Sequence, residues 1–213
     1  MTEAGSSAAV GRALLEAGTL TLTPDAPVTF RSGLRSPVYV DNRRLIFHPG
    51  PWRVVIEAFE ERMRRLPEQP EVVAGVEAAG IPHSSCLAYT SGMPSVFVRK
   101  QAKDHGLRGR VEGGDVRDRR AVLVEDMVTT GGSSLSAVEA LREAGAEVSD
   151  CFAIITYGFA RALEAFATAQ VALTTLTTFE TVVQESLERG DIDHRQASLV
   201  RSWLADPHAW DDR

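Results

Sequence analysis

The chain has 213 residues, of which 44% are hydrophobic and 24% are charged. These are ordinary values for a soluble globular protein that buries one core without disulfides or metal. The formal net charge of -6 argues against a protein that binds nucleic acids or membranes non-specifically. It leaves room for a local basic patch that binds a small anion.

The cysteines, the N-terminal segment and the lack of long apolar runs all favour a location in the cytoplasm. Cys86 and Cys151 lie in apolar segments, where two buried free thiols in a reducing compartment are a better interpretation than a disulfide framework. The N-terminal segment has neither a basic start nor a long apolar run, so no signal peptide is expected. No window approaches the roughly 18 apolar residues needed to span a bilayer. We therefore expect a cytoplasmic protein with no membrane or nucleic-acid partner.

In chain order, the pattern predicts an N-terminal helix, an extended segment over residues 19–47, and then alternating strands and helices to about residue 189. The predicted helices cover residues 6–17, 52–66, 84–90, 132–144 and 161–169, with two more near the C-terminus. The predicted strands cover residues 28–30, 37–40, 71–76, 95–98, 121–124, 148–157 and 171–176. Residues 99–118 are expected to form a long loop, because they contain four glycines and almost no apolar side chains.

These elements define an α/β fold. The strands after residue 70 are apolar runs without polar alternation, which is typical of a parallel sheet covered on both faces. We therefore predict an open, mostly parallel sheet flanked by helices, in a single domain over residues 1–213. Residues 1–48 and the C-terminal helices are expected to form a small cap, or hood, over the site.

The most informative stretch is AVLVEDMVTTGGSS, residues 121–134. Ligands of an open parallel sheet bind beyond the carboxyl ends of its strands, which is where Glu125 and Asp126 would lie. The small and hydroxyl residues after them lead into a helix N-terminus, whose N–H groups and dipole favour a phosphate. A sugar phosphate suits both halves, with its phosphate on the turn and its hydroxyls on the acids. The alternative is a strand end and helix cap with solvated acids.

This stretch resembles the phosphoribosyl-diphosphate binding motif of the type I phosphoribosyltransferases, in which apolar residues precede two acids, two variable residues and a Thr/Gly/Ser run. The resemblance implies that family's fold and a donor-binding site of consecutive residues. These are Glu125, Asp126, Met127, Val128, Thr129, Thr130, Gly131, Gly132 and Ser133. The motif identifies the ribosyl donor but not the acceptor base.

Other segments resemble the orotate phosphoribosyltransferases in particular. VRKQAKDHGLRG (98–109) is similar to that family's mobile catalytic loop, and FRSGLRSPVYVDNR (30–43) is similar to its N-terminal signature. GVEAAGIPHSS (75–85) looks like the turn that contacts the diphosphate. The resemblance covers about residues 12 to 206. It implies transfer of the phosphoribosyl group from phosphoribosyl diphosphate to orotate, giving orotidine 5'-monophosphate and diphosphate.

The resemblance gives catalytic roles to four loop residues, namely Arg99, Lys100, Lys103 and His105. Breaking the bond at ribose C1' builds negative charge on the leaving diphosphate, so cations that close over it and exclude water suit the reaction. Magnesium would be held mainly through the diphosphate rather than by a protein ligand set. In that family the loop, residues 99–118 here, reaches the neighbouring subunit's site, which implies a homodimer. The alternative is a solvated basic turn.

The remaining site residues have alternatives that the residues alone leave open. Arg31 matches a basic residue of the family near the diphosphate and base, and Thr129 matches a residue that touches orotate. Arg43 could pair with the orotate carboxylate or with Asp41. Tyr39 could border the base or belong to the core.

The sequence also departs from the family's pattern. Ala79 stands where another branch has a donor-binding lysine, and Tyr157 stands where some relatives have an orotate-binding arginine; Arg161, nearby, is expected on the next helix. Glu77 replaces a residue that is usually neutral, and a carboxylate near a diphosphate is unfavourable unless it points away or binds magnesium.

Two other functions are weighed against orotate transfer. The first is transfer to another nucleobase, which the DNR and KDHG segments disfavour. The second is a regulator that senses phosphoribosyl diphosphate and binds nucleic acid. The pI of about 5.4 and the lack of an added helix-turn-helix segment argue against a regulator.

Overall fold

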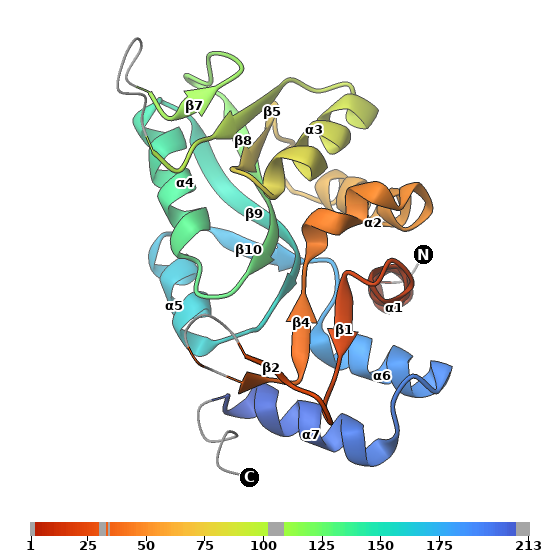
Figure 1. Cartoon of the computed structure of the whole chain (residues 1–213). Helices are drawn as coiled ribbons and strands as arrows, with labels where there is room; N and C mark the ends of the chain where they lie inside the picture. Colours follow the sequence, from red (N-terminus) through yellow and green to blue (C-terminus); the bar gives the residue numbers. More distant parts are fainter. Residues whose placement is uncertain (1–2, 30–32, 34, 102–108, 208–213) are drawn as a thin grey trace. The chain divides into compact units, whose positions relative to one another are not determined.

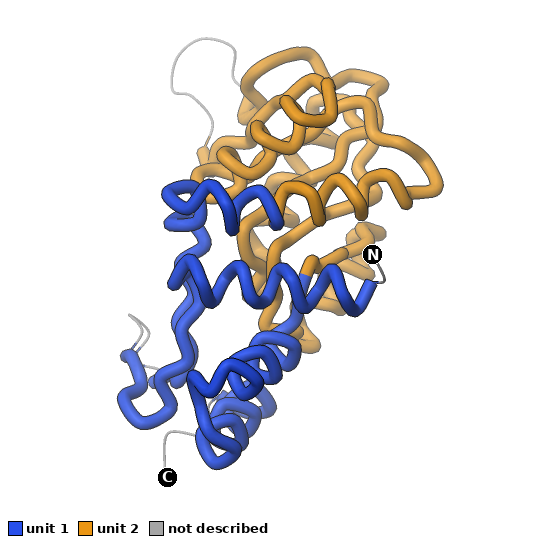
Figure 2. Tube along the Cα trace, turned by 90° about the vertical axis from the view of Figure 1, so that its right-hand side faces the viewer, with its two compact units in different colours: residues 1–54, 177–213 blue, residues 55–176 orange. Residues whose placement is uncertain are grey.

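The structure, a computed structural model, describes residues 3–29, 33, 35–101 and 109–207. The chain divides into two compact units (Figure 2). Unit 1 combines residues 1–54 with residues 177–213, and unit 2 comprises residues 55–176. Within the described residues, no helix is both long enough and apolar enough to cross a membrane.

Unit 2 is built on a six-stranded sheet with the strand order β10-β9-β8-β5-β6-β7 (Figure 1). The strands are β5 (Val72–Val76), β6 (Ser95–Val98), β7 (Val111–Glu112), β8 (Arg120–Val128), β9 (Glu147–Thr156) and β10 (Ala172–Thr175). All neighbouring pairs are parallel except β6 and β7, which are antiparallel. The expected open, mostly parallel α/β sheet is confirmed.

Helices cover both faces of this sheet (Figure 1). They are α2 (Pro49–Arg64), whose later part belongs to unit 2, α3 (Gly80–Ser91), α4 (Gly132–Glu143) and α5 (Ala160–Thr168). On one face, Phe59 of α2 stacks on Phe152 of β9 with ring centroids 6.3 Å apart. On the other, Leu141 of α4 and Phe166 of α5 join a buried cluster with Cys151 of β9. Alternate residues of β9 therefore serve two different helical layers.

Unit 1 joins the two ends of the chain. Its elements are α1 (Glu3–Glu16), β1 (Leu20–Leu22), β2 (Val28–Thr29), β3 (Arg35–Ser36), β4 (Val38–Val40), the 3-10 helix η1 (Asn42–Phe47), the start of α2, α6 (Phe179–Arg189) and α7 (His194–Ala205). Arg12 Nη1 lies 3.0 Å from both carboxylate oxygens of Glu185. The indole N–H of buried Trp203 donates to the Arg35 carbonyl at 2.8 Å. N-terminal segments and C-terminal helices therefore lie in one unit, and their role as a cap over the site stays a prediction.

Several predicted boundaries were wrong. Residues 42–47 form a 3-10 helix rather than extended chain, and α2 includes Pro49–Pro51 in its first turn, where proline fits well. The segment 99–118 contains the short strand β7, formed by pairing with β6. Strand β8 continues to Val128, beyond the predicted end at residue 124. The remaining predicted helices and strands occur with shifts at their ends.

We predict that Phe59→Ala lowers the free energy of unfolding by about 3–5 kcal/mol, because it removes a fully buried ring from the contact with Phe152. Urea unfolding followed by circular dichroism measures this. The matched control is Tyr89→Ala, which removes an aromatic ring that is 87% exposed in the same unit. Equal losses for the two variants would contradict the packing described for this face of the sheet.

Candidate active site

Five parallel strands of unit 2 end at the same edge of the sheet, and four of them lead into the predicted site segments. Their last residues are Val76 of β5, Val98 of β6, Val128 of β8 and Thr156 of β9. The turns that follow them bring together chain segments that are far apart in the sequence. Topology therefore places the acid pair, the glycine-containing turn and the start of the basic segment at one edge, as expected for a ligand site of this fold.

Glu125 lies inside the carboxyl-terminal part of β8, paired in register with Ala153 of β9, rather than after the strand as predicted. The side chain is buried, and its Oε2 accepts a hydrogen bond from Ser134 Oγ of α4 at 3.4 Å. Burial, followed by the neighbouring Asp126 carboxylate, raises the pKa of Glu125 well above its usual range. Burial therefore favours the uncharged form of this carboxyl group.

The turn after β8 leads directly into α4. Thr129 and Thr130 are exposed, Gly131 precedes the helix with φ of 82°, and α4 begins at Gly132 as predicted. A Cβ at Gly131 would lie 3.0 Å from Phe166 Cε2, so both conformation and space favour glycine. Gly131, the residue that precedes the helix, has no side chain with which to cap the helix N-terminus. Its exposed first residues, including Ser133, suit an anion.

The turn after β9 is tied to the end of β8. Thr156 Oγ1 donates to the Val128 carbonyl at 2.9 Å, and the Tyr157 amide donates to the same carbonyl at 3.3 Å. The rings of Tyr157 and Phe159 stack with their centroids 5.4 Å apart. Burial raises the pKa of Tyr157 to about 12. At neutral pH this edge therefore presents a neutral aromatic pair where some relatives are expected to have an arginine.

A third group of contacts surrounds residues 98–100, which we call the β6 junction. The Lys100 amide donates to Glu77 Oε2 at 2.8 Å, so the Glu77 carboxylate is directed at the backbone of the basic segment. Arg110 Nε donates to the Arg99 carbonyl at 2.8 Å. A cavity of about 120 Å³ adjoins the junction, lined by Lys100, Arg110, Ser133 and residues from β5, β6 and α4. The start of the predicted catalytic loop and Ser133, the end of the predicted phosphate-binding turn, thus line one cavity.

The other predicted site residues fall into two groups. Arg31, Lys103 and His105 lie outside the described residues. Tyr39 and Arg43 belong to unit 1; Tyr39 is 40% exposed, and Arg43 Nε forms an ion pair with Asp41 Oδ1 at 2.6 Å. That ion pair is the structural alternative that the sequence left open. The predicted orotate-binding roles of both residues stay predictions.

Arg99 occupies a half-buried position, with Nη1 3.7 Å from Glu112 Oε1 of β7. Its backbone amide also donates to the Arg110 carbonyl at 2.9 Å. In this structure the guanidinium therefore has an acidic neighbour on the adjacent antiparallel strand. Its catalytic role was predicted from a resemblance and stays a prediction.

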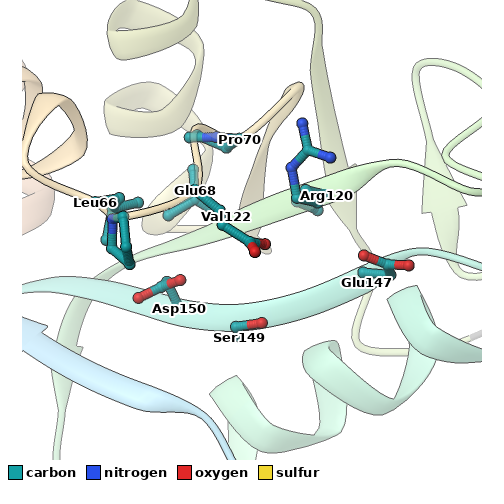
Figure 3. Close-up of a pocket in the computed structure, with 10 residues that line it drawn as sticks. Leu66, Glu68, Pro70, Arg120, Val122, Glu147, Ser149 and Asp150 are labelled. Carbon is teal, nitrogen blue, oxygen red and sulfur yellow. The ribbon is translucent and has the colours of Figure 1, made fainter.

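A second cavity, of about 280 Å³, lies near the amino ends of β8 and β9 (Figure 3). Its lining includes Glu68, Glu147 and Asp150, with Arg120 as the basic residue (Figure 3). Arg120 Nη2 already lies 3.4 Å from Glu71 Oε2. Three carboxylates make this cavity a poor site for a phosphate, in contrast to the carboxyl edge of the same sheet.

Sequence reasoning missed three contributors to the carboxyl edge. The hydroxyl of Ser134 donates to Glu125, a contact that the sequence motif does not predict. Glu77 was noted for its charge, but its bond to the Lys100 amide was not foreseen. Arg110 lies in the predicted loop, and no local pattern in the sequence indicates its contacts with Arg99 and Ser136.

Two further findings concern the chemistry of the chain. Cys151 is buried, as predicted, whereas Cys86 is only partly buried, and both are free thiols. Burial raises the pKa of both thiols. Across the described ranges, no group of three or more His, Cys, Asp or Glu side chains is arranged to hold a metal ion.

Comparison with known proteins assigns this chain to a class. Residues 47–186 match the model of the phosphoribosyl transferase domain family. The UMP synthase of Leishmania donovani has the same fold, with a TM-score of 0.80 and 23% identity over 95% of this chain, which spans 43% of that chain. These findings define the class as the phosphoribosyltransferases.

Relatives with higher sequence identity indicate which phosphoribosyltransferases this chain resembles most. The chain is 39% identical to the orotate phosphoribosyltransferase of Bacillus caldolyticus, over 92% of this chain and 95% of that protein. The crystal structure of orotate phosphoribosyltransferase from Aeropyrum pernix has a similar fold, with a TM-score of 0.70. The two sequences are 29% identical, and the match covers 85% of this chain and 98% of that chain. The chain therefore belongs to the orotate phosphoribosyltransferase family.

We predict that Glu125→Gln reduces the pH dependence of stability. The raised pKa of Glu125 means that the folded state binds more protons than the unfolded state above pH about 4.5. Stability therefore falls as pH rises towards the folded-state pKa, with a slope of at most about 1.4 kcal/mol per pH unit. A glutamine side chain does not titrate, so the free energy of unfolding of the variant should fall less steeply as the pH rises.

Urea unfolding between pH 5.5 and 8.5 measures the two slopes. Glu139→Gln, on an exposed position of α4, is the control and should remain parallel to the unsubstituted protein. Parallel profiles for Glu125→Gln and the unsubstituted protein would contradict a raised pKa of Glu125.

Proposed function

We propose that the protein transfers the 5-phosphoribosyl group from phosphoribosyl diphosphate to orotate, giving orotidine 5'-monophosphate and diphosphate, a step of pyrimidine nucleotide synthesis. The observation that carries the proposal is the carboxyl edge of unit 2, where the acid pair at residues 125–126 meets the open N-terminus of α4. Membership of the orotate phosphoribosyltransferase family supports the choice of acceptor.

In this proposal, the donor's 5-phosphate binds the turn from Thr129 to Ser133. Backbone N–H groups and the dipole of α4 favour its charge, and the hydroxyls add further hydrogen bonds. Glu125 and Asp126 accept hydrogen bonds from the ribose hydroxyls. These contacts hold the ribose at both ends and so fix the position of C1' for attack. The entropy of orienting the donor is then lost on binding and no longer contributes to the activation barrier.

The same acids fit the expected magnesium ion. Carboxylate oxygens are hard ligands, and Mg²⁺ in phosphate chemistry is commonly bound by one or two carboxylates plus substrate phosphates. We propose that Glu125 and Asp126 lie close to the ion, while the diphosphate holds it. When bound, magnesium neutralises part of the charge that develops on the leaving diphosphate.

The leaving diphosphate is proposed to face the β6 junction and the turn at residues 77–79. Lys100 is exposed there and lines the cavity that contains Ser133, so its ammonium group is well placed to attract the diphosphate. Arg99, Lys103 and His105 are proposed to complete the cation set. Arg31 is proposed as a further donor contact.

The acceptor is proposed to bind beside Thr129. Arg43 and Tyr39 are its other proposed contacts, and engagement of orotate by Arg43 would compete with the ion pair to Asp41. Pairing with a substrate carboxylate uses the planar guanidinium fork. The Tyr157–Phe159 pair provides no positive charge, so it does not replace the arginine of other relatives.

We also propose three features of the wider context. The protein acts as a homodimer in which residues 99–118 reach the neighbouring site, and unit 1 covers the site during the reaction. Two free cysteines support the reducing cytoplasm as the location. The oligomeric state is measured by sedimentation equilibrium, and a monomer would contradict the shared site.

The test of the proposed reaction is consumption of orotate, followed by ultraviolet absorbance, with phosphoribosyl diphosphate and magnesium. Adenine, guanine, hypoxanthine and uracil serve as parallel acceptors. We expect magnesium-dependent loss of orotate alone. Turnover of another base would overturn the acceptor assignment. Donor binding with no turnover of any base would favour a regulator.

A second prediction separates binding from folding. Gly132 is exposed at the first position of α4, and the space around its Cβ position is open within 4 Å. Gly132→Asp should keep or increase stability, because an acid favours a helix N-terminus. It should weaken donor binding by at least about tenfold, since one repulsive contact of about 1.4 kcal/mol has that effect.

Isothermal titration of phosphoribosyl diphosphate with magnesium measures this affinity. Gly132→Asn is the control of matched shape without charge, and it should bind markedly better than Gly132→Asp. Equal affinities of the two variants would contradict a phosphate on this turn.

A further inference from the structure

We propose that Glu77 is a positioning residue, whose carboxylate fixes the β6 junction and so orients Lys100 towards the leaving diphosphate. The proposal rests on the proposed function and extends it to a residue that sequence reasoning expected to be unfavourable. It assigns Glu77 neither to metal binding nor to contact with substrate.

The first observation is the way in which the ladder between β5 and β6 ends. The strands are parallel, and their last paired residues are Val76 and Val98. The Glu77 amide then donates to the Val98 carbonyl at 3.0 Å, which is the next regular ladder bond. In a regular parallel ladder, the Lys100 amide would donate to the backbone carbonyl of Glu77.

The side chain of Glu77 takes that position instead. The Lys100 amide donates to Glu77 Oε2 at 2.8 Å. Because the carboxylate substitutes for the backbone carbonyl, β6 stays paired for one more step while the chain after Glu77 leaves the sheet towards α3. A small neutral side chain at this position could not reach the amide in this way.

The second observation is that the opposite side of the β6 junction is also held. The Arg99 amide donates to the Arg110 carbonyl at 2.9 Å, and Arg110 Nε donates back to the Arg99 carbonyl at 2.8 Å. Arg110 Nη1 donates to the carbonyl and the hydroxyl of Ser136 at 3.0 and 2.9 Å. Arg110 thereby connects the junction to α4, which carries the anion-binding turn.

The hydrogen bonds of Arg110 and of Glu77 hold consecutive residues of the β6 junction. Arg110 fixes Arg99 relative to α4, and Glu77 fixes Lys100 relative to the turn after β5. When both sets of hydrogen bonds are formed, the backbone at residues 99–100 is fixed, and so is the direction in which the Lys100 side chain leaves it. The charge of Glu77 is engaged by a backbone N–H group, which explains how a carboxylate is tolerated beside a diphosphate site.

The test compares Glu77→Gln with Glu77→Ala. Glutamine keeps an oxygen that can accept from the Lys100 amide, whereas alanine removes it. We expect Glu77→Gln to keep kcat within about threefold and Glu77→Ala to lower kcat about tenfold, with KM for phosphoribosyl diphosphate changed less than kcat; loss of one such hydrogen bond corresponds to a change of this order. Glu139→Gln on α4 is the control and should leave both constants unchanged.

Two other roles for Glu77 give different results and would overturn the proposal. A magnesium ligand predicts that both variants lose activity alike and need more magnesium. A repulsive charge predicts that both variants lower KM for the donor without loss of kcat. Activity of Glu77→Ala equal to that of the unsubstituted protein would also overturn it.

A readout without turnover separates this proposal from the proposed function. Hydrogen exchange of the Lys100 amide, resolved by NMR, should be at least about tenfold faster in Glu77→Ala than in Glu77→Gln or the unsubstituted protein. Equal exchange rates would overturn the contact, whatever the reaction. If the unsubstituted protein consumes no orotate, the proposed function fails, and the exchange rates still decide whether Glu77 holds the junction.

Discussion

The parallel pairing of β5, β6, β8 and β9 is the constraint on which the rest of the structure depends. Parallel strands end at one edge, so segments that begin at residues 77, 99, 129 and 157 meet there. Gly80 allows α3 to begin close against β8, since a Cβ there would lie 2.5 Å from the Val124 carbonyl oxygen. The sheet thus assembles the site from turns.

The same edge contains polar groups that are stable only because each has a partner. Burial raises the pKa of Glu125, and its carboxyl group accepts a hydrogen bond from Ser134. Glu77 and Arg110 are engaged with the backbone of the β6 junction. The side chains of Thr129, Thr130 and Lys100 are exposed. The side chains that stabilise the carboxyl edge are therefore different from those that are exposed and can bind an anion.

Local signals in the sequence predicted the start of α4 at Gly132 and the buried runs of the central strands. What they could not predict depends on partners distant in the chain. Strand β8 extends to Val128 because its last residues pair with Ile155 and Thr156 of β9. The two-residue strand β7 exists through its pairing with β6. Glu77 finds the Lys100 amide 23 residues away, which no local pattern reveals.

The central claim is that the carboxyl edge of the sheet in unit 2 binds phosphoribosyl diphosphate. Hydrogen exchange with and without this donor and magnesium tests it most directly. We expect protection of peptides covering residues 126–136 and 77–81, with little change at residues 66–70 and 147–150, which adjoin the cavity at the other end of the strands. Protection confined to that second cavity, or no protection at the carboxyl edge, would contradict the account.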